Sequence, residues 1–265
     1  MSVLLQVSDP HFGTERASVV EALVALAAQA RPDLVVLSGD ITQRARVDQF
    51  RDARAVMDRL GAPLLALPGN HDIALFDLWS RVVRPHARYS AAFGADLAPV
   101  FASHELLVVG VNTTRAWRHK DGEVSGAQIE AVAERLRKAT PGQLRVVVVH
   151  QPIDVMRAED VPDRLHNHRA AQLAWAEAGA DLVMGGHIHL PYVMPLPGLP
   201  RPVWAVQAGT AVSSRVRSGV PNSVNLVRWA AATGCVVEQW DFSAAVGAFV
   251  CAVSTPIAPQ RAAPQ

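Results

Sequence analysis

Five short apolar runs of this chain are each followed, within three residues, by aspartate, asparagine or histidine. Such runs are typical of strands buried on both faces of a sheet, and an ionisable side chain at the end of a buried strand is costly unless something binds it. In open α/β sheets the carboxyl ends of the strands share one edge, where ligands bind. We therefore expect the clusters to form one site at that edge. The runs and their clusters are residues 3–8 with Asp9-Pro10-His11, 34–38 with Gly39-Asp40, 64–67 with Gly69-Asn70-His71-Asp72, 144–149 with His150, and 182–185 with Gly186-His187-Ile188-His189.

Helical patterns alternate with these runs. Apolar residues recur at helical spacing in four segments, and Ser125 stands where it would cap the third. The alternation of strands and helices predicts a layered α/β fold. The predicted helices are residues 18–30, 47–60, 125–138 and 169–178.

Two segments depart from this alternation of strands and helices. Residues 73–103 are irregular and are expected to form surface structure over the site, before a further strand at residues 106–112. After Pro191, short strands separated by Pro, Gly and Asn turns predict an antiparallel second sheet that closes a sandwich. We expect a single domain over residues 1–253 and a disordered, Pro/Ala-rich tail over residues 254–265. The late strands are residues 203–206, 224–229 and 236–241.

The charge balance argues against a polyanionic partner. The 25 Lys+Arg against 24 Asp+Glu give a net charge of +1, which offers no electrostatic footprint for long nucleic acid or an anionic membrane. No apolar stretch reaches the ~18 residues that span a bilayer, and the N-terminus has no signal-peptide pattern, so a cytoplasmic location is expected. Cys235 and Cys251 lie outside the clusters and are expected to be separate thiols, and without a CxxC pair no structural zinc module is expected.

The residue types in the clusters are those of a dinuclear metal site. Two divalent ions about 3.5–4 Å apart are a known arrangement for displacing groups at phosphorus. A carboxylate bridges two ions, imidazoles fill outer positions, and an amide adds a neutral oxygen. Asp9 and Asp40 would be the two anionic ligands, so two divalent ions keep a net positive charge that suits an anionic phosphoester. Mixed imidazole and oxygen ligands favour Mn²⁺, Fe²⁺/Fe³⁺ or Zn²⁺ over Mg²⁺ alone.

In order and spacing, the clusters resemble the signature of the calcineurin-like metallophosphoesterase superfamily, which is DxH, GD, GNH[DE], H and GHxH. The match runs from Asp9 to His189. The resemblance implies a four-layer α/β/β/α sandwich with two central mixed sheets, and a phosphoric ester hydrolase that uses two metal ions. It further implies that the first metal takes Asp9, His11, Asp40 and His189, and the second takes Asp40, Asn70, His150 and His187, so that Asp40 bridges them.

The resemblance also implies roles for residues beside the ligands. His71 would stay off the metals, hold the phosphate together with Asn70, and protonate the leaving oxygen, a role typically worth about 10²–10⁴ in rate. Asp72 is the expected orienting partner of the His71 ring.

Arg44 follows Asp40 by four positions, where the GDxxDRG motif of the protein phosphatases has its arginine. It is expected either to bind phosphate or to lie on the surface at the start of a helix. Gln43 and Ala45 replace the second aspartate and the glycine of that motif, which disfavours the protein phosphatases. The forms Gly-Asp-Ile-Thr around Asp40 and Gly-Gly-His-Ile-His-Leu-Pro around His187 instead resemble the bacterial class III cyclic-nucleotide phosphodiesterases and related glycerophosphodiesterases.

We therefore expect a phosphodiesterase that hydrolyses small phosphodiesters, such as 3′,5′-cyclic nucleotides, by attack of a metal-bound hydroxide. A pyrophosphatase of the UDP-diacylglucosamine type and a phosphomonoesterase are the alternatives. A DNA-repair nuclease is disfavoured by the charge balance, and a non-catalytic scaffold by the retention of His71 and of all seven ligand positions.

Other polar and aromatic residues are expected to have structural roles. His166 and His168 could reach a substrate pocket, but the exposed start of a helix is the expected position. Arg215 and Arg217 could steer phosphate, but a solvated loop is expected. Surface positions are expected for His86, His104 and His119. Packing, rather than stacking on a base, is expected for Trp79, Trp117 and Trp175.

Overall fold

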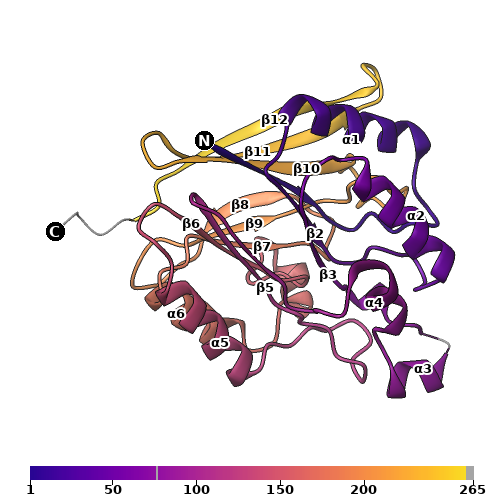
Figure 1. Ribbon diagram of the computed structural model, residues 1–265, viewed down its shortest axis with the longest axis horizontal. Coiled ribbons are helices and arrows are strands. Elements are labelled where there is room, and N and C mark those ends of the chain that lie inside the picture. Colours follow the sequence, from indigo (N-terminus) through magenta and orange to yellow (C-terminus); the bar gives the residue numbers. More distant parts are fainter. Residues whose placement is uncertain (76, 261–265) are drawn as a thin grey trace.

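The computed structural model describes residues 1–75 and 77–260. In this part of the chain, twelve strands form two six-stranded sheets that pack face to face (Figure 1). In spatial order, the first sheet contains β12 (Ala248–Ile257), β11 (Gly234–Ser243), β10 (Ser223–Ala230), β1 (Ser2–Val7), β2 (Leu34–Ser38) and β3 (Leu64–Leu67). The second contains β4 (Val100–Ala102), β5 (Leu106–Gly110), β6 (Leu144–Val148), β7 (Leu182–Gly185), β9 (Trp204–Gln207) and β8 (Tyr192–Pro195).

Each sheet combines parallel and antiparallel neighbours. Strands β1, β2 and β3 are parallel, and β10, β11 and β12 extend that sheet beyond β1 in antiparallel pairing. In the second sheet β5, β6, β7 and β9 are parallel, while β4 and β8 pair antiparallel at its two edges. These two mixed sheets confirm the predicted fold class.

The prediction that the strands after Pro191 form a separate antiparallel sheet is wrong. Strand β9 joins β7 in parallel within the second sheet, and β10 pairs with β1, placing Val227 opposite Leu4. Turn residues between short strands indicate where the chain reverses, but they do not determine which sheet edge accepts the next strand.

Helices cover the outer faces of both sheets and complete four layers (Figure 1). The α-helices of the described chain are α1 (Ala17–Ala30), α2 (Val47–Asp58), α3 (Leu78–Val83), α4 (Ala87–Phe93), α5 (Gly126–Arg137) and α6 (His168–Glu177). Helices α1 and α2 pack on the first sheet, and α5 and α6 on the second. The Ser125 hydroxyl accepts a hydrogen bond from the Gln128 backbone nitrogen at 3.2 Å, which confirms the predicted cap of α5.

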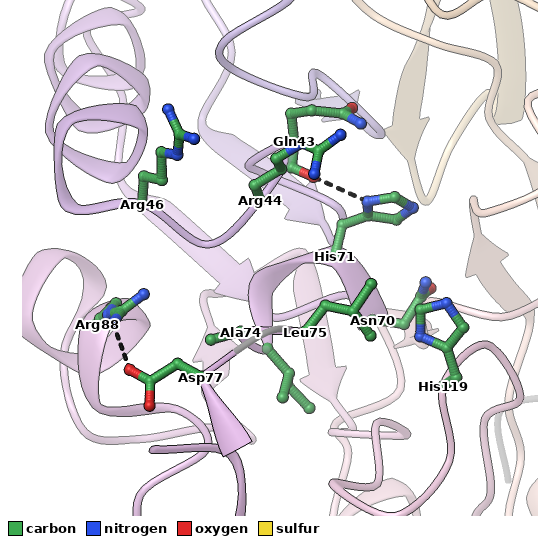
Figure 2. Close-up of a pocket in the computed structure, with 11 residues that line it drawn as sticks. Gln43, Arg44, Arg46, Asn70, His71, Ala74, Leu75, Asp77, Arg88 and His119 are labelled. Atoms are coloured by element: carbon green, nitrogen blue, oxygen red, sulfur yellow. Dashed lines mark hydrogen bonds and ion pairs between the residues drawn. The ribbon is translucent and has the colours of Figure 1, made fainter. Parts of the chain in front are cut away.

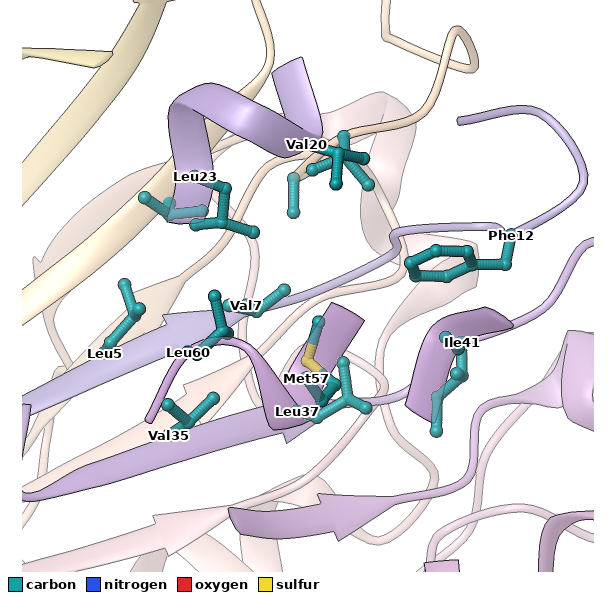
Figure 3. Close-up of a cluster of buried hydrophobic side chains, with 14 of the residues drawn as sticks. Leu5, Val7, Phe12, Val20, Leu23, Val35, Leu37, Ile41, Met57 and Leu60 are labelled. Carbon is teal, nitrogen blue, oxygen red and sulfur yellow. The ribbon is translucent and has the colours of Figure 1, made fainter. Parts of the chain in front are cut away.

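Alternate residues of the central strands face opposite sides of their sheet. Leu5 and Leu37 pack with Leu23 of α1 in the core beneath the helices (Figure 3). Their neighbours Leu4 and Val36 belong instead to the core between the two sheets. Both faces of these strands are therefore buried, which accounts for their continuous apolar runs.

Two segments differ from the sequence predictions. Residues 73–103 contain α3, α4 and β4, so this stretch is more regular than predicted. Strand β12 extends to Ile257 and pairs with β11, so residues 254–257 are not part of a disordered tail. Residues 261–265 lie outside the described residues, and a single domain over residues 1–253 stays a prediction.

The two thiols are separate, as predicted: Cys235 is buried, Cys251 is exposed, and neither forms a disulfide. Among the helices of the described chain, none combines the length and apolar character needed to cross a bilayer. The cytoplasmic location stays a prediction.

Candidate metal centre

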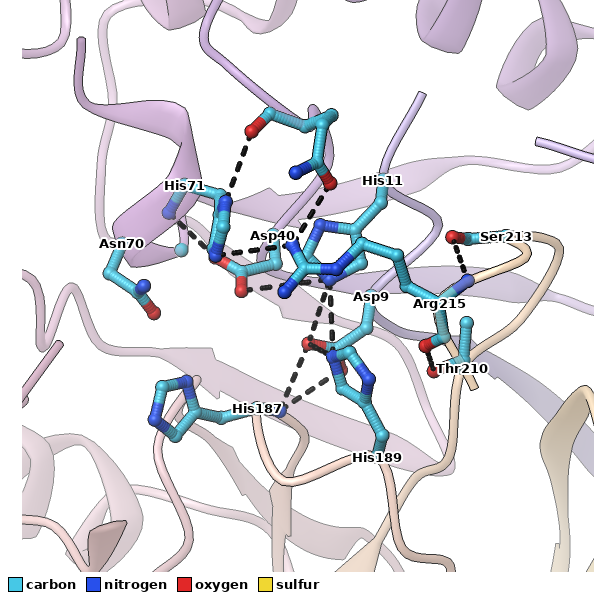
Figure 4. A network of polar contacts seen from close by, with 12 residues as sticks. Asp9, His11, Asp40, Asn70, His71, His187, His189, Thr210, Ser213 and Arg215 are labelled. Atoms are coloured by element: carbon cyan, nitrogen blue, oxygen red, sulfur yellow. Dashed lines mark hydrogen bonds and ion pairs between the residues drawn. The ribbon is translucent and has the colours of Figure 1, made fainter. Parts of the chain in front are cut away.

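The carboxyl ends of five strands bring the predicted metal ligands together at one edge of the two sheets (Figure 4). Three of these strands are parallel neighbours in the first sheet, and two are parallel neighbours in the second. The ligands are Asp9 and His11 after β1, Asp40 after β2, Asn70 after β3, His150 after β6, and His187 and His189 after β7. This is the arrangement that the strand-end pattern predicts.

One group of ligand atoms gathers around His11. Its Nε2 lies 3.1 Å from Nε2 of His189 and 4.0 Å from Oδ1 of Asp9. The His189 nitrogen is itself 3.4 Å from the same Asp9 oxygen. Oδ2 of Asp40 approaches the group from the side and lies 3.8 Å from the His11 nitrogen.

A second group gathers on the other side of Asp40. Nε2 of His150 lies 3.2 Å from Oδ1 of Asp40 and 3.2 Å from Oδ1 of Asn70. The ring of His187 stands 5.1 Å from the His150 ring, measured between centroids, and belongs to the same group. Asp40 thus presents one carboxylate oxygen to each group, which is the position that a bridging ligand requires.

The donor atoms of both groups fit divalent ions. Carboxylate oxygens and imidazole nitrogens are ligands of Mn²⁺, iron and Zn²⁺. Within residues 1–75 and 77–260, Nδ1 of His11 and both ring nitrogens of His187 are buried without a hydrogen-bond partner. Buried polar atoms normally have a partner, so these nitrogens mark a place for a further group.

The backbone is strained at the same residues. Positive φ angles between 41° and 73° occur at Asp9, His11, Asp40, His187 and His189. Residues other than glycine seldom adopt this left-handed region, and each instance costs on the order of 1–2 kcal/mol. Only three other non-glycine residues of the described chain have positive φ, so the strain is concentrated where ligands are positioned, as it is in functional sites.

Two glycines let the strand ends approach one another. A methyl group on Gly69 would overlap the backbone nitrogen and the carboxylate of Asp40, and one on Gly39 would overlap the His150 ring. Gly39 also has a φ of 98°, which a side chain disfavours. Close packing between the loops therefore explains both glycines of the motifs.

Hydrogen bonds orient the ligands from outside the two groups. Nδ1 of His150 pairs with the Ser38 carbonyl at 2.9 Å, which leaves Nε2 directed into the site. The His187 backbone nitrogen donates to both carboxylate oxygens of Asp9, at 3.1 and 3.0 Å, and so ties the loop after β7 to the end of β1. Asp163, which the sequence analysis did not single out, lies 3.7 Å through Oδ1 from Nε2 of His187.

Burial and charge keep several of these groups in forms that bind metals. Burial lowers the pKa of His11 to about 3, so its ring is neutral near pH 7. Burial would raise the pKa of Asp9, but the hydrogen bond and charge of His189 lower it to about 2. Burial likewise opposes ionisation of Asp40, yet the charge of His150 holds the pKa of that carboxyl well below its usual value. Neutral imidazole and ionised carboxylate are the metal-binding forms. Burial would lower the pKa of His150, but Asp40 raises it to about 9, so this ring must release a proton when a metal binds.

His71 lies beside the ligands as predicted, but Asp72 does not orient its ring, so that prediction is wrong. Nδ1 of His71 pairs with the backbone carbonyl of Gln43 at 3.0 Å, and its ring meets the His11 ring edge-on with centroids 4.9 Å apart. The buried Asp72 carboxylate instead fastens the loop after β2 to the turn that carries Asn70. It accepts hydrogen bonds from the backbone nitrogens of Ile41, Thr42 and Gly69.

Arg215, which was predicted to lie in a solvated loop, reaches the site (Figure 4). Its Nη1 lies 3.3 Å from Nε2 of His71 and donates to Oε1 of Gln43 at 2.9 Å. The loop returns to the site because the Ala211 backbone nitrogen donates to the Ser8 carbonyl at 2.9 Å. No spacing rule links position 215 to the motifs, so the prediction failed for lack of a tertiary signal.

A pocket of about 430 Å³ opens beside His71 (Figure 2). Arg44 lines it, as expected of a substrate-binding residue, and so do Arg46 and Arg88, which the sequence analysis did not assign. The role of Arg44 in binding the substrate stays a prediction.

The remaining candidates divide between buried and exposed positions. Trp175 is fully buried, as predicted. Trp79 and Trp117 are each 77% exposed, so the prediction that these two side chains pack inside the protein is wrong. His86 is half-buried rather than a surface residue. His168 is the first residue of α6 and takes no part in the two ligand groups.

Comparisons with known proteins agree with this geometry. Residues 2–191 match the family model of the calcineurin-like phosphoesterases. Over 83 residues the chain is 39% identical to the glycerophosphodiester phosphodiesterase GpdQ of Enterobacter lignolyticus, covering 26% of this chain and 29% of that protein. Over 163 residues it is 26% identical to a cAMP/cGMP dual specificity phosphodiesterase of Mycobacterium tuberculosis, covering 60% of this chain and 49% of that protein.

The fold is also similar to that of a purple acid phosphatase from yellow lupin, with a TM-score of 0.73 and 12% identity over 97% of this chain and 53% of that chain. The matched regions span less than two thirds of each of these three proteins.

Proposed function

Because the chain belongs to the calcineurin-like phosphoesterase family, we propose that it is a metal-dependent phosphodiesterase that hydrolyses small phosphodiesters. The observation that carries the proposal is the convergence of seven ligand side chains on two groups that share Asp40. Two relatives named as phosphodiesterases support a diester rather than a monoester as substrate.

The proposal assigns the two groups to two ions. Asp9, His11 and His189 would hold one ion, Asn70, His150 and His187 the other, and Asp40 both. When bound, such ions attract phosphoryl oxygens and acidify an attacking water. Mn²⁺, Fe²⁺/Fe³⁺ and Zn²⁺ are the metals that suit this donor set.

His71 and Arg215 would act on the phosphoryl group from the side opposite the ligands. The Gln43 carbonyl only accepts hydrogen bonds, so Nδ1 of His71 carries a hydrogen and Nε2 faces Arg215. An anionic phosphoryl oxygen between Nε2 and the guanidinium would be bound by both groups. With a hydrogen on Nε2 as well, His71 would donate it to the leaving oxygen as the general acid.

The test is hydrolysis by purified protein loaded with Mn²⁺, Fe²⁺ or Zn²⁺. Bis(p-nitrophenyl) phosphate and p-nitrophenyl phosphate form a matched diester and monoester with the same chromophore. We expect the higher kcat/KM for the diester and loss of activity with a chelator. Faster hydrolysis of the monoester would contradict the proposed preference for diesters. If protein with two bound ions hydrolyses neither compound, the proposal that it is a phosphoric ester hydrolase is wrong.

A second assay addresses the substrate class. Cyclic AMP, cyclic GMP, glycerophosphodiesters and nucleotide-sugar pyrophosphates would be compared at equal concentration. Cleavage of pyrophosphates alone would replace the phosphodiesterase by a pyrophosphatase of the UDP-diacylglucosamine type.

A further inference from the structure

We propose that the pocket beside His71 binds a second anionic group of the substrate through Arg44 and Arg46. The preferred substrates are then phosphodiesters or pyrophosphates whose leaving part carries a further phosphate or carboxylate. This inference rests on the proposed function, because it names the substrate class of the same site.

The pocket adjoins the metal centre beside Asn70 and His71. Asn70 and His71 form its inner end, and Arg44 and Arg46 lie farther from the ligands along the same wall (Figure 2). A substituent of a phosphoryl group held beside Asn70 and His71 would enter this pocket. Its volume of about 430 Å³ falls within the range of ordinary small-molecule sites.

The described lining of the pocket is cationic. Three arginines and a single acidic residue, Asp77, line it. Asp77 pairs with Arg88 at 2.8 Å, and in the described lining the arginines outnumber the acidic residue three to one. Arginine presents several donors in a fixed plane, which suits phosphate and carboxylate oxygens.

A fixed turn presents the two arginines. Between them, Ala45 has a φ of 50°, a left-handed conformation that persists only where surrounding contacts hold it. The Ala45 backbone nitrogen donates to the Thr42 hydroxyl at 2.9 Å, and the Ala45 carbonyl accepts from the Arg88 guanidinium at 3.1 Å. The Arg44 backbone nitrogen donates to the side-chain oxygen of Gln49 at 2.9 Å.

The same turn supplies the Gln43 carbonyl that holds His71. The proposed anion site and the ring expected to transfer the proton are therefore set by one rigid piece of backbone. Such preorganisation lowers the entropic cost of positioning a substrate that contacts both.

The rest of the lining indicates what lies between the two anionic groups. Ile73, Ala74 and Leu75 give the pocket an apolar side. A sugar or nucleoside would cover these residues while its terminal phosphate reaches Arg44 and Arg46. A cyclic mononucleotide has a single phosphate and leaves both arginines without a ligand.

The experiment compares the dinucleotide ApA with pApA and ApAp, which carry one extra phosphate at either end. With the metal-loaded wild-type protein we expect kcat/KM to be about tenfold higher for at least one of the phosphorylated forms, as expected of partly solvated charged contacts. In Arg44→Ala/Arg46→Ala this preference should fall to about twofold or less. Arg44→Lys/Arg46→Lys, which keeps the charge, should retain part of it.

Arg51→Ala is the matched control, because Arg51 is an exposed arginine of the adjoining α2 that lies outside the pocket and pairs with Asp52. It should keep the full preference. Calorimetry on the same proteins would compare adenosine 3′,5′-bisphosphate with adenosine 5′-monophosphate, and the tighter binding of the bisphosphate should disappear only in the double alanine variant.

Two different failures are distinguishable. If bis(p-nitrophenyl) phosphate is hydrolysed but ApA, pApA and ApAp are cleaved equally well, the anion site is wrong and the phosphodiesterase stands. If no diester is hydrolysed, the proposed function fails, and the calorimetric comparison still decides whether the pocket binds a second phosphate. A preference that survives in the double alanine variant would also overturn the assignment.

Discussion

The guanidinium of Arg215 lies 3.3 Å from Nε2 of His71, although 144 residues separate the two positions in the chain. Both side chains are also tied to Gln43, His71 through its backbone carbonyl and Arg215 through its side-chain oxygen. Three residues from three segments of the chain thus form one unit beside the ligand groups. The unit places a guanidinium and an imidazole ring together at the edge of the metal centre.

Removing Arg215 should therefore impair turnover. We expect Arg215→Ala to lower kcat/KM for bis(p-nitrophenyl) phosphate by about 10²-fold, the effect of losing a preorganised donor to developing charge. Arg215→Lys should recover part of this loss, because an ammonium keeps the charge but not the planar fork. Arg228→Ala is the control, because it removes an arginine of β10 that pairs with Glu238 of β11. Arg215→Ala with activity within twofold of wild type would exclude this role.

The sequence predicted the parts of the site that follow from strand ends. Asp9 and Asp40 follow β1 and β2, and the parallel pairing of these neighbouring strands places the two carboxylates together without knowledge of the loops. His150 follows β6 of the other sheet and joins them because the two sheets pack face to face. The glycines beside them were also informative, because Gly69 is required by its contact with Asp40.

Residues positioned by tertiary contacts were not predictable in the same way. Arg215 reaches the site from a loop and Asp163 from the end of a short 3₁₀ helix, and neither hydrophobic period nor motif spacing indicates the distance of these residues from the ligands. The Asp72 assignment failed for a related reason. Adjacency to His71 suggested a side-chain pair, whereas the 3₁₀ turn at Asn70–Asp72 directs the carboxylate toward backbone donors.

Asp72 should support stability more than proton transfer. Asp72→Asn places an amide NH₂ group among donors that need an acceptor, so we expect the free energy of unfolding to fall by about 2–4 kcal/mol. Urea unfolding with a chelator present would measure this loss. His71→Gln provides the contrast, because it should lower kcat while leaving the unfolding midpoint nearly unchanged. Equal stability of Asp72→Asn and wild type would contradict the structural role.

His86 should make the fold less stable in mild acid. Burial lowers the pKa of His86 from 6.5 to about 4. Between these values the unfolded chain binds a proton that the folded chain excludes, so stability is lost as the pH falls from 6.5 toward 4. In His86→Asn, the loss of unfolding free energy between pH 7.5 and pH 5 should be smaller by about 1 kcal/mol after allowance for partial exposure. If the free energy of unfolding has the same pH dependence in chelator-treated wild type and in His86→Asn, the loss of stability in acid does not come from His86.

Asp40 is the residue on which both ligand groups depend, since its two oxygens lie 3.2 Å from Nε2 of His150 and 3.8 Å from Nε2 of His11. Asp40→Asn keeps the size of the side chain but removes the negative charge that both ions would share. We expect elemental analysis of protein grown with Mn²⁺ to find about two ions per chain in the wild type and fewer than one in the variant. Activity should fall well beyond the ~10–100-fold typical of residues that only support ligands.

Thermal unfolding gives an independent measure of the same binding. A metal that binds the folded state raises its stability by mass action, so added Mn²⁺ should raise the Tm of the wild type more than that of Asp40→Asn. Asp58→Asn is the matched control, because it makes the same chemical change at an exposed carboxylate that pairs with Arg54. Retention of about two ions by Asp40→Asn, with an unchanged Tm response, would rule out a shared ligand at this position, because each group would then hold its ion without the Asp40 charge.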